Sequence, residues 1–165
     1  MKERMEKYMM KLMEIASFST ETLAAQNMVY ARRCGAYGAG NYALMAQVKE
    51  WAFLKGLMDD DAVILGIARD DMTKVAPENC RYDVCLLGAV DQTPNWLHQV
   101  FFDGGNYAVI EIPHTAEAVA LVWQEGIGTA VERGYKVDDK RPIIERYMKA
   151  KVDQGLCEFL IPIMG

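Results

Sequence analysis

The order of predicted elements repeats along this chain, and the repetition restricts the folds that it can adopt. Residues 28–34, 63–69 and 82–87 predict strands, and an amphipathic helix follows the first of them. The second half repeats strand, helix, strand, strand, beginning with residues 106–113. One βαββ unit leaves a face of its sheet in need of cover, so two units packed side by side are a natural solution. The sequence therefore predicts an α+β fold built from two βαββ modules. The modules would span about residues 27–90 and 103–165.

The first predicted helix follows a glycine-rich turn. Asn41 is expected to be its N-cap, and Gly56 is expected to end it. Val48, Trp51 and Ala52 fall on one face of this helix. That apolar face predicts packing on the sheet.

The second predicted helix begins at the capping residue Thr115 and ends at Gly134. Its apolar side includes Trp123. Gly126 and Gly128 lie inside it, and each glycine costs a helix about 1 kcal/mol relative to alanine. The pair therefore predicts a bend or a break in this helix.

Residues 1–26 form a lead that is rich in methionine, glutamate and lysine. Met5, Met9, Leu12 and Met13 recur at helical spacing, which predicts a short amphipathic helix packed on the domain or on a partner. Alternatively, the lead is the remnant of a linker or coiled coil that once joined a DNA-binding module. About 26 residues cannot supply a helix-turn-helix domain and its linker, so we expect no DNA binding by this chain alone.

Charge and composition narrow the possible functions. The 165 residues carry a net charge of −5, which argues against a nucleic-acid-binding surface. No apolar run approaches the length of a membrane span, and the N-terminus lacks a signal-peptide core. The four cysteines form no CxxC pair and the two histidines are scattered. We therefore expect a cytoplasmic protein with reduced thiols and without a metal or cofactor.

Two carboxylates stand in apolar strands near the C-terminus. Ile143, Glu145 and Tyr147 alternate along one predicted strand and so share a face, and Glu158 and Leu160 share a face of the next. This pattern predicts both carboxylates on the inner surface of a hairpin. A buried carboxylate without a partner is costly, so it either takes up a proton or meets a cation. An acid in an apolar, aromatic lining suits a receptor for lipophilic cations.

The same strand allows the opposite orientation, with Glu145 outward and Ile144, Arg146 and Met148 inward. Burying Arg146 would be at least as costly as burying the acid. The pattern therefore favours an inward Glu145. The pattern also favours an inward Glu158, and the alternative is a simple surface acid.

Five aromatic residues are further candidates for a ligand site. Those on the predicted helices are more often core residues than ligand contacts, and those at turns or strand edges can line the mouth of a cleft. The helical pair is Trp51 and Trp123, and the others are Tyr37, Phe102 and Tyr107.

Several short segments, in this order and spacing, resemble the GyrI-like small-molecule-binding domain. This domain is found alone and as the effector-binding part of AraC-type and MerR-type multidrug-sensing regulators. Each segment is short, and their shared order makes the resemblance specific over nearly all of the chain after Asn27. The segments are residues 30–37, 81–85, 102–109, 134–139, 142–147 and 158–163.

The resemblance implies two pseudo-symmetric βαββ modules that enclose a cleft for drugs, dyes and other lipophilic cations. In the family's regulators a buried glutamate pairs with the ligand's charge, and Glu145 matches that position. A second glutamate on the following strand matches Glu158, and Tyr147 and Leu160 match wall positions. Some free-standing relatives resemble hydrolases that open strained cyclopropyl rings with a glutamate.

Two functions therefore compete. A binding module would sense or sequester a lipophilic cation, with Glu145 as counter-charge. An enzyme would use Glu145 as a catalytic acid or base toward a strained ring, and the sequence offers no separate nucleophile constellation. The absence of such a constellation favours binding. An interaction module acting through the N-terminal helix or a sheet edge is the third alternative, and a homodimer or a separate regulator chain is a possible partner.

Overall fold

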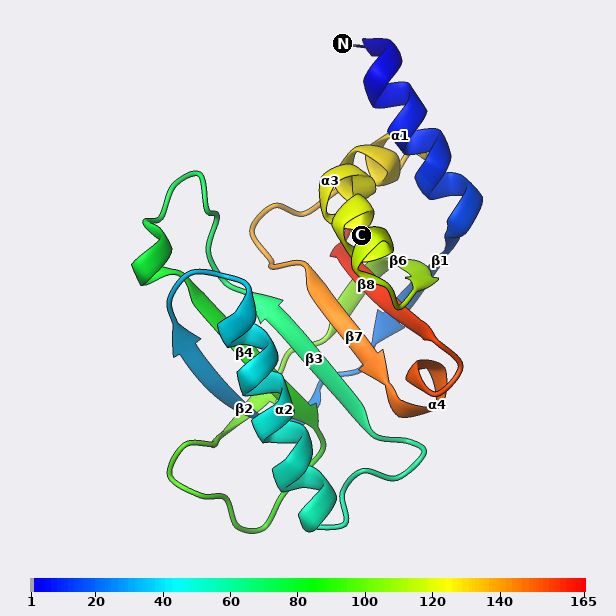
Figure 1. Ribbon diagram of the computed structural model, residues 1–165. Coiled ribbons are helices and arrows are strands. Elements are labelled where there is room, and N and C mark those ends of the chain that lie inside the picture. Colours follow the sequence, from blue (N-terminus) through cyan, green and yellow to red (C-terminus); the bar gives the residue numbers. More distant parts are fainter. Residues whose placement is uncertain (1) are drawn as a thin grey trace.

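An eight-stranded antiparallel sheet organises the molecule, as the computed structural model shows (Figure 1). The structure describes residues 2–165, with side chains from Glu6 onward. The strands are β1 (Ser17–Leu23), β2 (Gln26–Cys34), β3 (Val63–Ala68), β4 (Arg81–Leu87), β5 (His98–Phe102), β6 (Gly105–Pro113), β7 (Ile144–Met148) and β8 (Leu156–Pro162). The helices are α1 (Lys2–Ile15), α2 (Ala39–Leu54), α3 (Ala116–Glu132) and the short α4 (Lys149–Val152), with a 3-10 turn at Pro77–Asn79.

The two expected modules occupy the two halves of this sheet. Its strand order is β1-β6-β8-β7-β3-β4-β2-β5, so one half holds β6, β8 and β7, and the other holds β3, β4 and β2. Each half follows the chain order strand, helix, strand, strand, as the sequence predicts. The halves meet where β7 pairs with β3, near the centre of the sheet.

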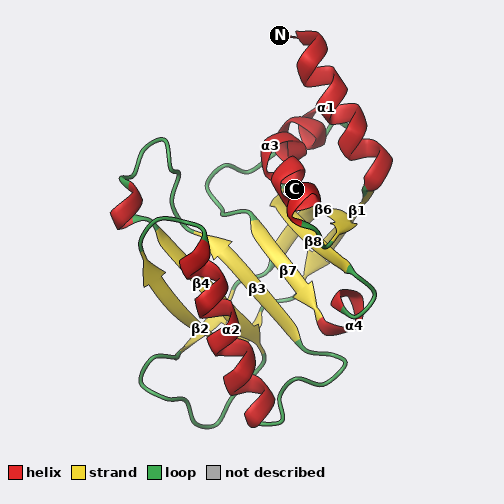
Figure 2. Ribbon diagram, viewed as in Figure 1, coloured by secondary structure: helices red, strands yellow, loops and turns green. Residues whose placement is uncertain are grey.

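Helices α2 and α3 lie on the same face of the sheet, each over its own half (Figure 2). Val48 and Ala52 of α2 pack on the inner strands of the first module. Leu121 and Val122 of α3 pack on β6 and β8. The junction of β7 and β3 runs between the two helices. Tyr147 of β7 packs against both helix-side cores and so joins them.

The opposite face of the sheet carries a third apolar cluster. Only Ala24 and Ala25 separate β1 from β2, although these strands lie near opposite edges of the sheet. The sheet must therefore curl so that its edges approach each other. Gly104, at φ +71°, lies so close to the backbone of this link that a β-carbon would overlap the Leu23 carbonyl oxygen. Leu23, Phe102 and eight further residues form the apolar cluster on this face.

Helix α3 is continuous from Ala116 to Glu132, so the break that was one of the two outcomes expected at its glycines, a bend or a break, does not occur. Gly126 lies on the buried side of α3, where a β-carbon would stand 3.3–3.6 Å from Val122, Ile161 and Ile110. Gly128 faces α1, where a β-carbon would stand 2.9 Å from the Met9 methyl carbon. The two glycines therefore allow close packing, which compensates for their low helix propensity.

The ends of the helices match the predictions in part. Thr115 caps α3 by accepting a hydrogen bond from the Ala118 amide, as expected. The N-cap of α2 is Gly38 rather than Asn41. The Asn41 side chain instead accepts a hydrogen bond from Arg33. Among the described residues no helix is both long and apolar enough to cross a membrane.

The N-terminal lead contains a helix and a strand. Helix α1 packs on α3, with Leu12 fully buried between them. The side chain of Met5 lies outside the described residues. Residues 17–23, expected to belong to the helical lead, form β1 and pair with β6. The polar sequence of β1 lacks the apolar alternation that marks a strand.

Candidate functional site

Glu145 lies on the helix-side face of the sheet, at the junction of the two modules. Its register partners are Gly66 on β3 and Phe159 on β8. Residues directly opposite in neighbouring strands share a face, so Glu145 lies beside the helix-side core. Ile143 and Tyr147 project to the same side, as the sequence predicts. We call Glu145, Tyr147, Tyr82 and Gly66 the Glu145 site.

Two tyrosine hydroxyls donate hydrogen bonds to the Glu145 carboxylate. The Tyr147 hydroxyl lies 2.5 Å from Oε2 and the Tyr82 hydroxyl lies 3.2 Å from Oε1. Burial raises the pKa of Glu145, and the two hydrogen bonds oppose that rise. Burial and the neighbouring carboxylate raise the pKa of both tyrosines, which therefore remain donors at neutral pH.

Gly66 makes room for this arrangement. A β-carbon at position 66 would overlap the Tyr82 hydroxyl oxygen and would stand 3.5 Å from Oε1 of Glu145. Tyr82 is a residue of β4, and its side chain extends across β3 to the Glu145 carboxylate on β7. Glycine has no side chain, so at position 66 of β3 it leaves room for the Tyr82 side chain to reach Glu145.

Aromatic residues flank the Glu145 site on both sides. On the α3 side, Trp123 packs edge-on against Phe159 at 4.8 Å between ring centroids and remains 41% exposed. On the α2 side, Tyr37 packs edge-on against Tyr82 at 6.2 Å. The structure therefore brings the predicted residues Trp123 and Tyr37 to the same face as Glu145.

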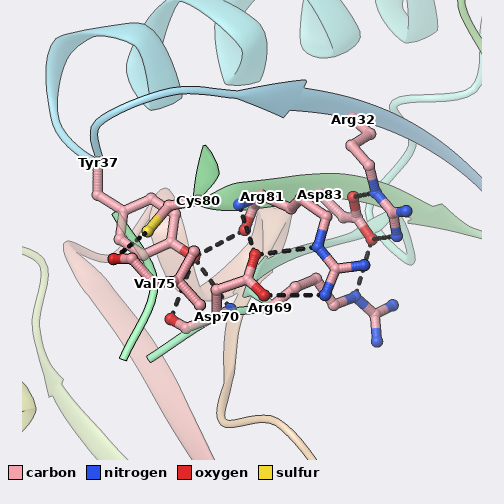
Figure 3. Close-up of polar contacts among 8 residues, drawn as sticks. All are labelled: Arg32, Tyr37, Arg69, Asp70, Val75, Cys80, Arg81 and Asp83. Carbon is pink, nitrogen blue, oxygen red and sulfur yellow. Dashed lines mark hydrogen bonds and ion pairs between the residues drawn. The ribbon is translucent and has the colours of Figure 1, made fainter. Parts of the chain in front are cut away.

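Tyr37 is fixed by the backbone of a neighbouring loop (Figure 3). Its hydroxyl donates to the Arg81 carbonyl oxygen at 2.8 Å and accepts from the Asp70 amide at 3.1 Å. The Asp70 carboxylate accepts two hydrogen bonds from the Arg81 guanidinium and one from the Arg81 amide. These bonds lower the pKa of Asp70 to about 2. Tyr37, whose hydroxyl is hydrogen-bonded to the backbone of Asp70 and Arg81, thus packs against the Tyr82 ring.

Lys49 and His114 stand above Tyr147, and neither was predicted from the sequence. The Lys49 ammonium nitrogen lies 5.7 Å from the centre of the Tyr147 ring. The His114 ring centroid lies 5.4 Å from the same ring. Burial lowers the pKa of Lys49, and burial together with the Lys49 charge lowers the pKa of His114. A polar cap therefore covers the ring whose hydroxyl contacts Glu145.

Glu158 lies on the other side of the sheet, so the prediction that it joins Glu145 on one inner surface is wrong. It lies directly opposite Arg146 of β7, and the two form a bidentate pair at 2.9 Å. Arg146 also contacts Glu21, and Lys151 lies 3.6 Å from Glu158. Arg146 was expected to be costly to bury, but here a directly opposed carboxylate neutralises it.

Four other predicted residues also lie away from the Glu145 site. Trp51 is two residues from Lys49, hence about 200° around α2, and its ring packs on Trp96 at 6.4 Å. The remaining three belong to the apolar cluster on the opposite face of the sheet. They are Leu160, Phe102 and Tyr107.

The Glu145 site has no metal-binding constellation among the described residues. Within residues 2–165 no group of three or more histidine, cysteine or acidic side chains is arranged to hold a metal ion. One surface hollow lies beside Glu21 and Met164 and another beside Lys55 and Asp91, and Glu145 lines neither of these two. Lys49 and His114 lie over the Tyr147 ring, so side chains of the protein cover part of the site.

A family model described as the GyrI-like small molecule binding domain matches residues 16–164. The chain is 39% identical over 145 residues to the "SPbeta prophage-derived putative transcriptional regulator YosT" of Bacillus subtilis, a match that covers 87% of this chain and 96% of the relative.

Two solved structures share the fold at low sequence identity. The structure of SAV2435 bound to tetraphenylphosphonium has a TM-score of 0.59 and 16% identity, and the match covers 90% of this chain and 94% of that one. EcmrR, solved in a complex with DNA, has a TM-score of 0.70 and 9% identity. That match covers 97% of this chain and 63% of EcmrR, so the chain spans less than two thirds of that protein.

Proposed function

Because the chain belongs to the GyrI-like family of small-molecule-binding domains, we propose that it binds lipophilic, positively charged small molecules at Glu145, for sensing or sequestration. Drugs, dyes and toxins with an aromatic body and a delocalised charge fit this description. Glu145 would supply the counter-charge, and Tyr147 and Trp123 would supply aromatic surface. The ligand would enter between α2 and α3 by displacing side chains that now cover the site.

The observation that carries the proposal is the lack of a cationic partner for Glu145. Asp83 and Glu158 are strand carboxylates that are more fully buried than the half-buried Glu145, and each is paired with arginine: Asp83 with Arg32 and Arg69, as Figure 3 shows, and Glu158 with Arg146. Among the described residues Glu145 contacts only neutral hydroxyl donors. A buried carboxylate gains most from a cation when none is already present.

The surrounding aromatic rings favour the same ligand class. A cation over the face of an aromatic ring gains about 0.5–2 kcal/mol, and more when water is excluded. Trp123 is exposed enough to meet a ligand while it is anchored on Phe159. The tetraphenylphosphonium bound by SAV2435 is a lipophilic cation, which supports this class by likeness of fold.

The proposal is tested by titrating a fluorescent lipophilic cation into the wild type and the Glu145→Gln variant, followed by mass analysis of the ligand. We expect saturable binding by the wild type, loss of at least tenfold in affinity in the variant, and a ligand of unchanged mass. Lack of saturable binding by a correctly folded wild type would contradict the proposal. Equal affinity of the wild type and the variant for the cation would show that Glu145 does not contribute to binding.

A second function, hydrolysis of a strained ring, is favoured by one feature of the same site. The raised pKa of Glu145 keeps a proton available closer to neutral pH, and a carboxylic acid of that kind can act as a general acid. One ring C–C bond would break as the acid protonates one of its carbons and water bonds to the other, electrophilic carbon, and the proton released by that water would return to the Glu145 carboxylate. A ligand that gains the mass of one water in the wild type, and not in Glu145→Gln, would establish this activity.

A further inference from the structure

Lys49 is a half-buried cation on α2. It lies on the side of α2 that faces Tyr147, and its ammonium group stands over the Tyr147 ring. Within the described part of the chain, no carboxylate pairs with it and no hydrogen bond satisfies it. Arg146 and Lys151 meet carboxylates, and the half-buried Arg33 donates to the Ala36 carbonyl oxygen and to the Asn41 side chain. An anion that binds beside the half-buried Lys49 ammonium group would stabilise its charge.

His114 adds a second donor on the same side of Tyr147. It follows β6, and its backbone amide donates to the Gly155 carbonyl oxygen at 2.8 Å, which fixes the segment. The imidazole is exposed and inclined at 45° to the Tyr147 ring. A neutral imidazole still offers one N–H group, so Lys49 and His114 together present donors to the open side of the site.

Tyr147 separates this positive region from Glu145. Its hydroxyl contacts the Glu145 carboxylate, whereas its ring faces Lys49 and His114. Lys49 forms no ion pair with Glu145, so the two charges remain available to different parts of a ligand. A ligand that carries only a positive charge would be attracted by Glu145 and repelled by Lys49. A ligand that also carries a carboxylate or sulfonate would satisfy both.

We propose that Lys49 and His114 form an anion-accepting subsite, and that the preferred ligands are zwitterionic aromatic molecules with a cationic group and a carboxylate or sulfonate. This inference rests on the proposed function, because Glu145 binds the cationic group. Lys49 is then the residue that sets specificity within the site. Trp123 and Tyr147 contact the aromatic body, and the anionic group lies between Lys49 and His114.

A matched pair of dyes tests the inference: a rhodamine with a free carboxylate, which is a zwitterion, and its methyl ester, which is a cation. Binding of each is measured by fluorescence polarisation to the wild type, Lys49→Met, Lys49→Arg and Lys55→Met. Lys55 follows α2 and is exposed, so its replacement controls for the general loss of a positive charge. Thermal unfolding of each variant confirms that it is folded.

We expect the wild type to bind the acid roughly tenfold more tightly than the ester, as a hydrogen bond between charged groups predicts. Lys49→Met should abolish that preference by weakening binding of the acid and relieving the repulsion of the ester, whereas Lys49→Arg and Lys55→Met should retain the preference. Equal binding of acid and ester by the wild type, or an unchanged preference in Lys49→Met, would overturn the subsite and leave cation binding intact. Failure of the wild type to bind either dye would contradict the subsite together with the proposed function.

Discussion

Gly66 and Glu145 are register partners in β3 and β7, and the missing side chain of the glycine leaves room for a third residue to reach the carboxylate. Tyr82 crosses above Gly66 and donates to Glu145 from β4, two strands away. The first module thus supplies the glycine and one tyrosine, and the second supplies the carboxylate and the other tyrosine. The Glu145 site exists only where the two modules meet.

Replacing Gly66 with alanine should displace the Tyr82 hydroxyl from Glu145, because the new β-carbon would occupy its place. We expect a loss of about 1–3 kcal/mol in the free energy of unfolding, the usual cost of overpacking a buried site. Urea denaturation measures it. The matched control is Gly66→Ala in a Tyr82→Phe background, where the obstructed hydroxyl is absent. The account is contradicted if the alanine costs as much in that background as in the wild type.

The stability of the wild type should fall relative to Glu145→Gln as the pH rises above the ordinary glutamate value. Burial raises the pKa of Glu145 from 4.5, so between 4.5 and the raised value the folded state holds a proton that the unfolded state has lost. The folded state then binds more protons, and stability decreases with rising pH by about 1.4 kcal/mol for each pKa unit of the shift. Glutamine does not titrate, so its curve lacks this decrease.

Denaturation of both proteins over about pH 4 to 8 gives the comparison. Parallel curves would show that the pKa of Glu145 is not raised by folding. A lipophilic cation should reduce the difference between the curves, because it stabilises the ionised carboxylate.

The two tyrosine hydroxyls should contribute unequally to cation binding. Tyr147 donates at 2.5 Å and Tyr82 at 3.2 Å, and each bond favours the ionised form of Glu145. Tyr147→Phe should therefore weaken binding at neutral pH by about 1.5 kcal/mol, and Tyr82→Phe should weaken it less. Calorimetric titration at several pH values distinguishes the cause. At high pH, where Glu145 is ionised in all variants, the affinities should converge, and a constant loss at every pH would contradict this explanation.

Glu158 and Arg146 should matter for stability and not for ligand binding. Replacing Glu158 with alanine leaves a buried guanidinium without its bidentate partner, which costs about 3–5 kcal/mol. The double variant Arg146→Met, Glu158→Leu should recover much of this loss, because an apolar pair fits the interior. Lys149→Met, which removes only exposed ion pairs, should change stability by less than about 1 kcal/mol.

Guanidinium denaturation measures the stabilities of these variants. Dye binding by the folded variants tests the expectation that Glu158 and Arg146 do not affect ligand binding. A selective loss of cation binding in a stable Glu158 variant would show that Glu158 takes part in ligand binding.

Alternation and order along the chain were sufficient to predict most of the fold. Ile143, Glu145 and Tyr147 share a face because strand periodicity allows nothing else. Strand β1 was missed because its polar, exposed sequence carries no apolar alternation. Gly126 does not break α3, because helix propensity is a local property, whereas this glycine packs against Ile161, which is distant in the sequence.

The Glu145 site was predictable only in part. Glu145 and Tyr147 are close in sequence, but Tyr82 reaches Glu145 across Gly66, and that contact depends on the pairing of β3 with β7. Arg146 was misjudged for the same reason, because its partner Glu158 is set by strand register. Gly66, in the middle of the apolar segment 63–68, was the one local sequence feature that indicated this contact, because a glycine inside a strand often marks a place where another group approaches the backbone closely.

Discrimination between a cation and a neutral ligand of the same shape tests the central claim most directly. The affinities of a lipophilic arylphosphonium ion and of its neutral isostere are measured for the wild type and Glu145→Gln at about pH 8, where the carboxylate is most fully ionised. The account predicts that the variant loses at least tenfold in affinity for the cation and little for the neutral compound. Equal losses for both compounds would show that Glu145 shapes the site without acting as the counter-charge, and would contradict the account.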